Sequence, residues 1–267
     1  MCCPADFFRF VDYLGHGVKR LLCFLFAVLL ISLPSFSWAQ FLTVSAAASL
    51  TDAFKELGAK FEATHPDVTV RFNFAASGVL LQQIRQGAPV DVFASADEPT
   101  VSRGIEAGVL DGSTRRDFAA NALVLIVPAG QASSVKSLTD LSTPEVRRIA
   151  IGKIPTVPVG RYTQEALEGA NLWTPLTPKF VQADSVRQVL DYVARGEAEA
   201  GFVYRTDAVL MPNDVRIVEV VSGHTPVTYP VVTVSASREQ ATAKAFIDYL
   251  VSPPAQAILK RYGFSQS

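Results

Sequence analysis

Short apolar runs alternate with helix-patterned segments along most of the chain, and this alternation restricts the fold more than any other feature. Residues 41–48 form an apolar run, and the segment after it places Leu50, Phe54, Leu57 and Phe61 at helical spacing. The same order recurs twice more, with strands expected at 68–76 and 90–95 and helices expected at about 78–85 and after residue 97. This repeated strand–helix order predicts an α/β fold with mostly parallel strands and helices on both faces of the sheet.

A second series of the same kind begins near Ala119. Strands are expected at 122–127, 148–152, 180–183, 198–204 and 229–234, and helices at about 162–169 and from Asp184. The C-terminal segment is expected to be helical over 238–251, with a final short helix from Pro253. Because no long linker separates the two series, we expect two lobes joined by strands, with a cleft between them.

Residues 1–39 have the pattern of a cleavable secretory signal. Lys19 and Arg20 precede an apolar run over 21–33, which is too short to span a bilayer comfortably, and small residues flank Trp38. We expect cleavage before Gln40, and therefore an exported protein. A retained membrane anchor is the alternative.

Cysteine content and charge exclude several classes of protein. The three cysteines all fall inside the expected signal, at Cys2, Cys3 and Cys23. The remainder therefore has no thiol for a metal site, a redox pair or a nucleophile. The formal net charge is −1, unlike the strongly basic balance of nucleic-acid-binding proteins. This charge gives no overall field that would attract an anion, so an anion site would have to be local.

Four expected helix starts could supply such a local site. They are Ala48-Ser49-Leu50, Ala76-Ser77-Gly78, Val159-Gly160-Arg161 and Asp184-Ser185-Val186. Each presents backbone N–H groups without an intrahelical acceptor, together with the positive end of the helix dipole, and such ends bind oxyanions. The alternative is that Ser49 and Ser77 only cap their helices, and residues 49–52 fit a capping box.

An exported serine hydrolase is a competing interpretation with little support. It would use Ser49 or Ser77 as nucleophile and would need a base beside it. His65 and His224, the only histidines after residue 39, fall in expected loops, and the chain has no GxSxG motif.

Several motifs together resemble the periplasmic molybdate-binding proteins of ABC transporters. They include AAASLT at 46–51, FAASG at 74–78, GAPVDVFASAD at 87–97, VPVGRY at 157–162, DSVR at 184–187, GFVY at 201–204 and KRYGF at 260–264. The resemblance covers nearly all of the chain after residue 39. It implies a type II periplasmic-binding-protein fold, with two α/β lobes joined by two crossing strands and the ligand between them. The lobes implied are 40–120 with 233–267, and 121–232.

The resemblance also implies a set of oxyanion-binding residues. Ser49 and Ser77 would contribute hydroxyl and backbone N–H groups, Val159 and Val186 backbone N–H groups, and Tyr204 its phenolic hydroxyl. Ala76 stands where relatives often have serine, and Val159 where alanine is common. The implied function is capture of molybdate, and of tungstate, for delivery to the permease and ATPase of an ABC importer. No enzymatic activity, cofactor, direct metal-cation ligand or nucleic-acid partner is expected, and the protein is expected to be a periplasmic monomer.

The chemistry of these five positions agrees with a fully deprotonated tetrahedral dianion. Such an anion presents only acceptors, and neutral donors satisfy it. Phosphate usually retains a proton at neutral pH and would need a carboxylate acceptor, yet none of the five positions is acidic. Sulfate has the same charge and shape as molybdate and stays an alternative ligand, and an oxyanion sensor stays an alternative role. Arg161 is expected to be a solvated residue near the cleft mouth and not a ligand.

Overall fold

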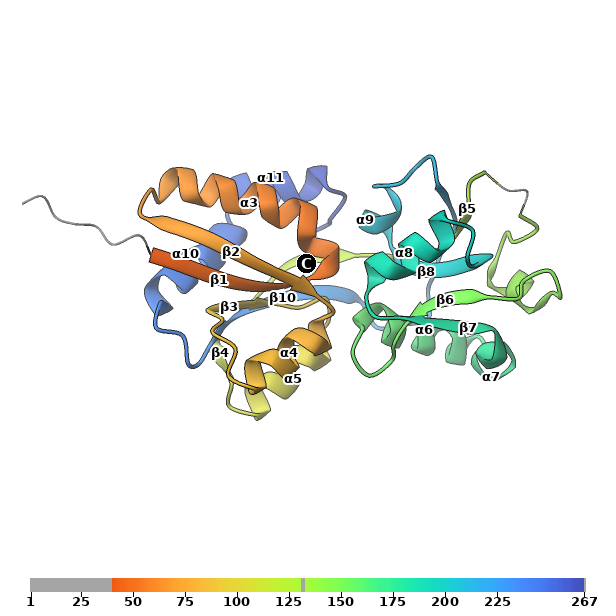
Figure 1. Cartoon of the computed structure of the whole chain (residues 1–267), viewed down its shortest axis with the longest axis horizontal. Helices are drawn as coiled ribbons and strands as arrows, with labels where there is room; N and C mark the ends of the chain where they lie inside the picture. The colour runs from red at the N-terminus through yellow and green to blue at the C-terminus, as the bar shows by residue number, and fades with distance from the viewer. Residues whose placement is uncertain (1–39, 131–132, 267) are drawn as a thin grey trace, which may run out of the picture. The chain divides into compact units, whose positions relative to one another are not determined.

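The computed structural model describes residues 40–130 and 133–266, so the expected signal lies outside the described residues. The described part contains two five-stranded sheets, each with helices on both faces (Figure 1). Within this part of the chain, no helix has the length and apolar character needed to cross a membrane.

The first lobe is built on the sheet β2-β1-β3-β10-β4. Helices α3, α10 and α11 cover one face of this sheet, and α4 and α5 cover the other (Figure 1). Helix α3 places Ala53, Phe54, Leu57 and Phe61 in the core, as its helical spacing predicts. The bounds are β1 Gln40–Ala47, η1 Ala48–Leu50, α3 Thr51–Thr64, β2 Val68–Ala75, α4 Ser77–Arg85, β3 Val92–Ala94, α5 Glu98–Glu106, β4 Leu110–Asn121, β10 Val227–Val234, α10 Gln240–Leu250 and α11 Pro253–Arg261.

The second lobe is built on the sheet β7-β6-β8-β5-β9. Helices α8 and α9 lie on one side of it, and α6 and α7 lie on the other (Figure 1). Its central strands β5, β6 and β8 are buried along their whole lengths, as expected for continuous apolar runs. The bounds are β5 Leu123–Pro128, η2 Leu138–Ser142, β6 Ile149–Gly152, α6 Pro158–Gly169, α7 Trp173–Leu176, η3 Thr177–Lys179, β7 Phe180–Ala183, α8 Val186–Ala194, β8 Ala200–Tyr204, α9 Arg205–Ala208 and β9 Val215–Val220.

Both sheets are mixed, so the expectation of mostly parallel strands is wrong. In each sheet two strand pairs are parallel and two are antiparallel. Strands β4 and β9, which the sequence analysis did not predict, form an edge of their sheets, and each has one strand neighbour. One side of an edge strand faces solvent, so such a strand carries polar residues that hide its pattern. Residues 111–117 of β4 read DGSTRRD.

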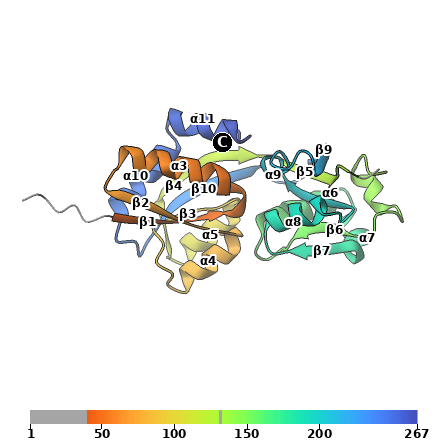
Figure 2. The same cartoon turned by 45° about the horizontal axis from the view of Figure 1, so that its top comes forward.

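The chain passes between the two sheets twice, which confirms the two lobes with crossing segments. The first crossing joins β4 to β5 around Asn121 and Ala122, and the second joins β9 to β10 over residues 221–226 (Figure 2). All of β10, from Val227, belongs to the first lobe's sheet. The expected boundaries between the two lobes, after residues 120 and 232, remain predictions.

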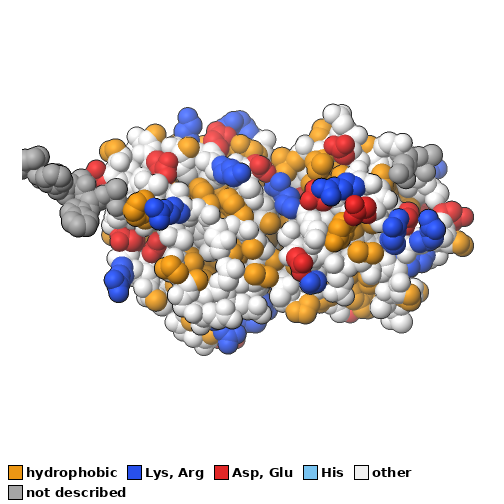
Figure 3. Space-filling model, viewed as in Figure 1, with side chains coloured by type: hydrophobic (Ala, Val, Ile, Leu, Met, Phe, Trp, Pro, Cys, Tyr) orange, Lys and Arg blue, Asp and Glu red, His pale blue; other side chains and the backbone are white. Residues whose placement is uncertain are grey.

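Charged side chains of both signs are interspersed over the two lobes on the face seen in Figure 3. This distribution agrees with the near-zero net charge of the sequence. Such a distribution gives no long-range attraction for an anion on this face, so an anion site would have to depend on local features of the cleft.

Candidate functional site

The predicted helix starts meet at one small cavity between the lobes. The cavity is small and partly open to solvent, with about 210 Å³ of space not filled by atoms when the adjoining open solvent is included, and none of the described residues that line it is charged. All five predicted residues, Ser49, Ser77, Val159, Val186 and Tyr204, line it. The full lining is Ala47, Ala48, Ser49, Ala76, Ser77 and Ala96 from the first lobe, and Val157, Pro158, Val159, Val186 and Tyr204 from the second.

Strand order explains why these helix starts converge. In the first lobe, β1 and β2 are parallel neighbours, and η1 and α4 begin directly after them. In the second lobe, β6 and β7 are parallel neighbours, followed by α6 and α8. The carboxyl ends of parallel strands share one edge of a sheet, and the two edges face each other across the cleft. The first N–H groups of each helix therefore point toward the space between the lobes.

The two serines do not cap their helices, so the capping interpretation is wrong. Neither η1, α3 nor α4 has a side-chain hydrogen bond at its N-cap. The Ser49 hydroxyl lies 3.0 Å from the Tyr229 hydroxyl, and the Ser77 Oγ accepts a 3.0 Å hydrogen bond from the Ala96 N–H. Both serines are buried, and their hydroxyls bond residues of other elements.

Tyr204 brings a buried hydroxyl to the cavity from the end of β8. The residue is 1% exposed, and no group in the described part of the chain forms a hydrogen bond with its hydroxyl. Burial, reinforced by the neighbouring Tyr229, raises the pKa of Tyr204 well above its usual value. The phenol therefore stays protonated and can donate a hydrogen bond.

Arg161 is not a solvated residue, which corrects that expectation. Its side chain is 19% exposed and forms an ion pair with Asp97, which is 2% exposed and lies in the other lobe. The Nε–Oδ2 distance is 3.0 Å, and the guanidinium also donates to Thr100 Oγ1 and to the Ile154 carbonyl. Arg161 does not line the cavity, and its donors are directed at protein groups.

Asp184 also lies outside the cavity. Its carboxylate pairs with Lys153 at an exposed position, beside a larger cleft that Arg187 also lines. Asp184 is therefore not among the residues that line the cavity.

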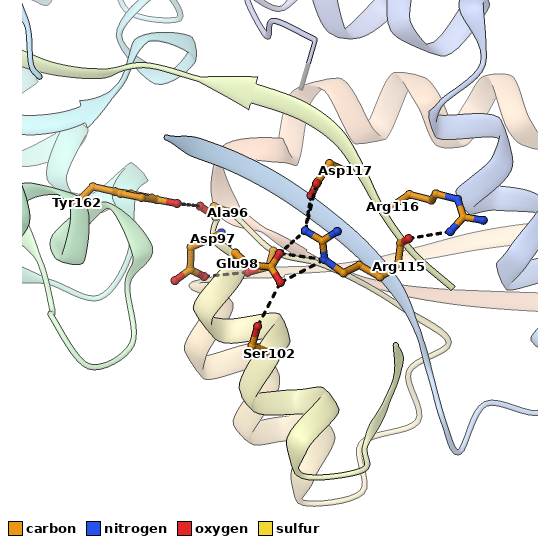
Figure 4. A network of polar contacts seen from close by, with 9 residues as sticks. Ala96, Asp97, Glu98, Ser102, Arg115, Arg116, Asp117 and Tyr162 are labelled. Carbon is orange, nitrogen blue, oxygen red and sulfur yellow. Dashed lines mark hydrogen bonds and ion pairs between the residues drawn. The ribbon is translucent and has the colours of Figure 1, made fainter. Parts of the chain in front are cut away.

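Further contacts join the lobes around the cavity. The Gly78 N–H donates to the Thr156 carbonyl at 2.9 Å, and a Cβ at position 78 would lie 2.7 Å from that oxygen, so only glycine fits. The Tyr162 hydroxyl reaches the Ala96 carbonyl at 3.5 Å (Figure 4).

Arg187, which is partly exposed, forms an ion pair with the buried Asp207, and the sequence analysis missed this pair. Arg187, from α8, lies 2.7 Å from Asp207 in its own lobe and 2.8 Å from Asp52 in the other. Asp207 is fully buried, and burial raises its pKa to about 6 although Arg187 opposes the shift. Asp207 and Ala208 follow the GFVY motif and belong to the same family resemblance, but the motif gives no sign of burial, because the burial of Asp207 depends on the packing of a four-residue helix against β5, β8 and β9.

Comparison with known proteins gives consistent matches over the described part of the chain. Residues 42–265 match the family described as bacterial extracellular solute-binding protein. The chain is 38% identical over 230 residues to the molybdate-binding protein ModA of Escherichia coli, covering 84% of this chain and 88% of that protein.

Two solved structures agree with this match. The substrate-binding domain of a putative molybdenum ABC transporter from Clostridium difficile is 38% identical, with a TM-score of 0.66, over 85% of this chain and 99% of that one. The periplasmic molybdate-binding protein of Azotobacter vinelandii is 25% identical, with a TM-score of 0.74 and the same coverage. From its sequence match and its fold, the chain belongs to the family of bacterial extracellular solute-binding proteins.

Proposed function

We propose that this protein captures molybdate, and tungstate, in the periplasm and delivers it to an ABC importer. Ser49, Ser77, Val159, Val186 and Tyr204 would hold the oxyanion with hydroxyl and backbone N–H donors. The observation that carries the proposal is the unpartnered Tyr204 hydroxyl, buried at a cavity where helix N-termini from both lobes meet. The relatives named as molybdate-binding proteins support this ligand class.

Neutral donors are sufficient for such a ligand. Each helix N-terminus contributes roughly 0.3–1 kcal/mol, and a hydrogen bond to a charged group about 1.5–3 kcal/mol. Together these terms offset the cost of dehydrating the dianion. They do so without a lysine or arginine at the cavity, so the ligand can still be released to a membrane partner.

Binding without chemical change fits the serines better than hydrolysis does. A serine nucleophile needs a base within hydrogen-bonding reach. Ser49 and Ser77 bond Tyr229 and Ala96, whereas His65 and His224 bond backbone carbonyls elsewhere. We infer a solute-binding protein that is exported by its first 39 residues and acts as a monomer with a permease and an ATPase.

Thermal unfolding of residues 40–267 with different oxyanions tests the proposed ligand. A ligand that binds only the folded state adds about 2.7 kcal/mol of stability at 100 times its dissociation constant. We expect molybdate and tungstate to raise the melting temperature at concentrations where sulfate and phosphate do not. A shift with sulfate and none with molybdate would overturn the proposal in favour of a sulfate-binding protein.

A further inference from the structure

Ser49 contacts a partly buried chain of polar side chains, Tyr229, Asn121 and Thr206. Its Oγ lies 3.0 Å from the hydroxyl of Tyr229, a fully buried residue of β10. Either oxygen could donate this hydrogen bond, and the direction decides what Ser49 presents to the cavity. If Tyr229 donates, the serine proton is free to point at a ligand. If Ser49 donates, only its lone pairs remain.

Asn121 settles the direction. It lies at the end of β4, where the chain first crosses between the lobes. Its Oδ1 accepts a 2.9 Å hydrogen bond from the Ala122 N–H, which fixes the orientation of the amide. The Nδ2 group therefore faces Thr206 Oγ1 at 2.8 Å and the Tyr229 oxygen at 3.3 Å.

An amide nitrogen can only donate, so the Tyr229 oxygen accepts from Asn121. Among the described residues, Ser49 Oγ is the other atom within hydrogen-bonding distance of the Tyr229 hydroxyl, so the phenolic proton is satisfied only if it is directed there. Burial, the main cause, raises the pKa of Tyr229 well above its usual value, so this proton is retained. Ser49 accepts from Tyr229, and its own proton is left to point into the cavity.

We propose that Asn121 and Tyr229 are positioning residues that hold the Ser49 hydroxyl as a donor, so that the site selects oxyanions carrying no proton. The inference rests on the proposed oxyanion-binding function and extends it to selectivity. Ser77 needs no such side chains, because its Oγ accepts from the Ala96 backbone N–H. A hydrogenphosphate ion that placed its O–H at Ser49 would meet a hydroxyl whose proton already points toward it, and such a contact is repulsive, so this position cannot accept the phosphate proton.

Substitution of Asn121 by aspartate reverses this chain of hydrogen bonds. Both carboxylate oxygens of Asn121→Asp accept, so one keeps the Ala122 N–H and the other takes the Tyr229 proton. Ser49 must then donate to Tyr229 and present lone pairs to the cavity. Tyr229→Phe is the milder variant, because it removes the hydroxyl and leaves Ser49 free to rotate.

The test compares hydrogenphosphate with sulfate at mildly alkaline pH, where both are dianions of similar size that differ by one proton. Competition of each against molybdate, followed by calorimetry, gives a ratio of dissociation constants. The charge that Asn121→Asp adds weakens both anions and cancels in this ratio. We expect the ratio of phosphate to sulfate dissociation constants to fall about tenfold or more in Asn121→Asp, and less in Tyr229→Phe. Molybdate binding should weaken in both variants.

Tyr249→Phe is the matched control, since it also removes a tyrosine hydroxyl, one with no hydrogen-bond partner in the described chain. The inference would be overturned if sulfate still binds both test variants and the ratio of phosphate to sulfate dissociation constants is unchanged. Continued exclusion of hydrogenphosphate by both variants counts as an unchanged ratio. Failure of the unsubstituted protein to bind molybdate would instead overturn the proposed function. Tyr229→Phe, the smaller change, keeps the test decisive if Asn121→Asp does not fold.

Discussion

The two lobes contribute to the cavity in different ways. The first lobe offers two serine hydroxyls, whose oxygens already contact Tyr229 and the Ala96 N–H. The second offers helix starts at Val159 and Val186 and the unpartnered hydroxyl of Tyr204. Side-chain identity should therefore control binding in the first lobe, whereas in the second the backbone should matter at the two valines.

Each lobe also buries a carboxylate near the cleft, and the two are neutralised differently. Asp97 of the first lobe pairs with Arg161 of the second. Asp207 of the second lobe pairs with Arg187 of its own lobe. The ion pair of Asp97 therefore depends on contact between the lobes, whereas that of Asp207 does not.

The largest effect is expected from removing both serine hydroxyls. Ser49→Ala with Ser77→Ala loses two hydrogen bonds to a charged ligand, about 3–6 kcal/mol, or roughly a hundredfold to ten-thousandfold in affinity. Val159→Ala with Val186→Ala should cost far less, because the N–H groups remain. Calorimetric titration with molybdate compares the two pairs, and equal losses would contradict the division between lobes.

The next effect concerns stability and distinguishes Asp207 from other carboxylates. Its pKa is raised from 3.8 to about 6, so the folded state holds a proton that the unfolded state has released. The contribution of Asp207 to stability is therefore full at acid pH and is lost as pH rises through about 6.

We expect the free energy of unfolding of the unsubstituted protein, relative to that of Asp207→Asn, to fall by about 3 kcal/mol as the pH rises from below 3.8 to above about 6. Urea unfolding at a series of pH values measures the difference, with Asp214→Asn as a control for loss of an exposed carboxylate. A difference that does not change with pH would show that Asp207 is ionised throughout.

The positions of the two serines could be predicted from the sequence, but the partners of Ser49 and of Arg161 could not. The serines follow apolar runs directly, so local patterning and the family motifs indicated their positions, and the structure places them at one cavity. Their hydrogen-bond partners were beyond reach, because the Ser49–Tyr229 contact joins residues 180 positions apart. Arg161 was misjudged for the same reason, since its partner Asp97 is 64 positions away and in the other lobe.

The same distinction between local and long-range information applies to the fold. Buried strands such as β5 and amphipathic helices such as α8 have continuous or periodic apolar residues, and they were predicted. Edge strand β4 and the antiparallel pairing of β10 depend on how the chain returns from the second lobe. Local sequence does not carry that information.

A smaller loss of affinity is expected for Arg161→Ala. The variant leaves Asp97 buried without its ion pair whenever the lobes are in contact, although Ser95 Oγ still donates to it. We expect about 2 kcal/mol, or roughly thirtyfold, with the same factor for molybdate, tungstate and sulfate. Asp52→Ala, which removes the more exposed partner of Arg187, should cost less than about threefold. A change in selectivity between oxyanions in Arg161→Ala would indicate direct contact with the ligand.

The smallest effect tests the backbone of the second lobe directly. Val186 is the first residue of α8, where proline fits a helix and removes only an N–H that has no intrahelical acceptor. Ser185 before it is extended, with φ −156° and ψ 164°, which suits the residue that precedes a proline.

Val186→Pro should therefore fold and lose about tenfold in molybdate affinity, whereas Val186→Ala should lose less than about threefold. Both variants lose the branched valine side chain, so the difference between their dissociation constants reports the loss of the N–H group and its replacement by the proline Cδ. Equal dissociation constants would mean that the backbone of α8 does not hold the anion. The second lobe would then hold the anion with the Val159 N–H of α6 and the Tyr204 hydroxyl.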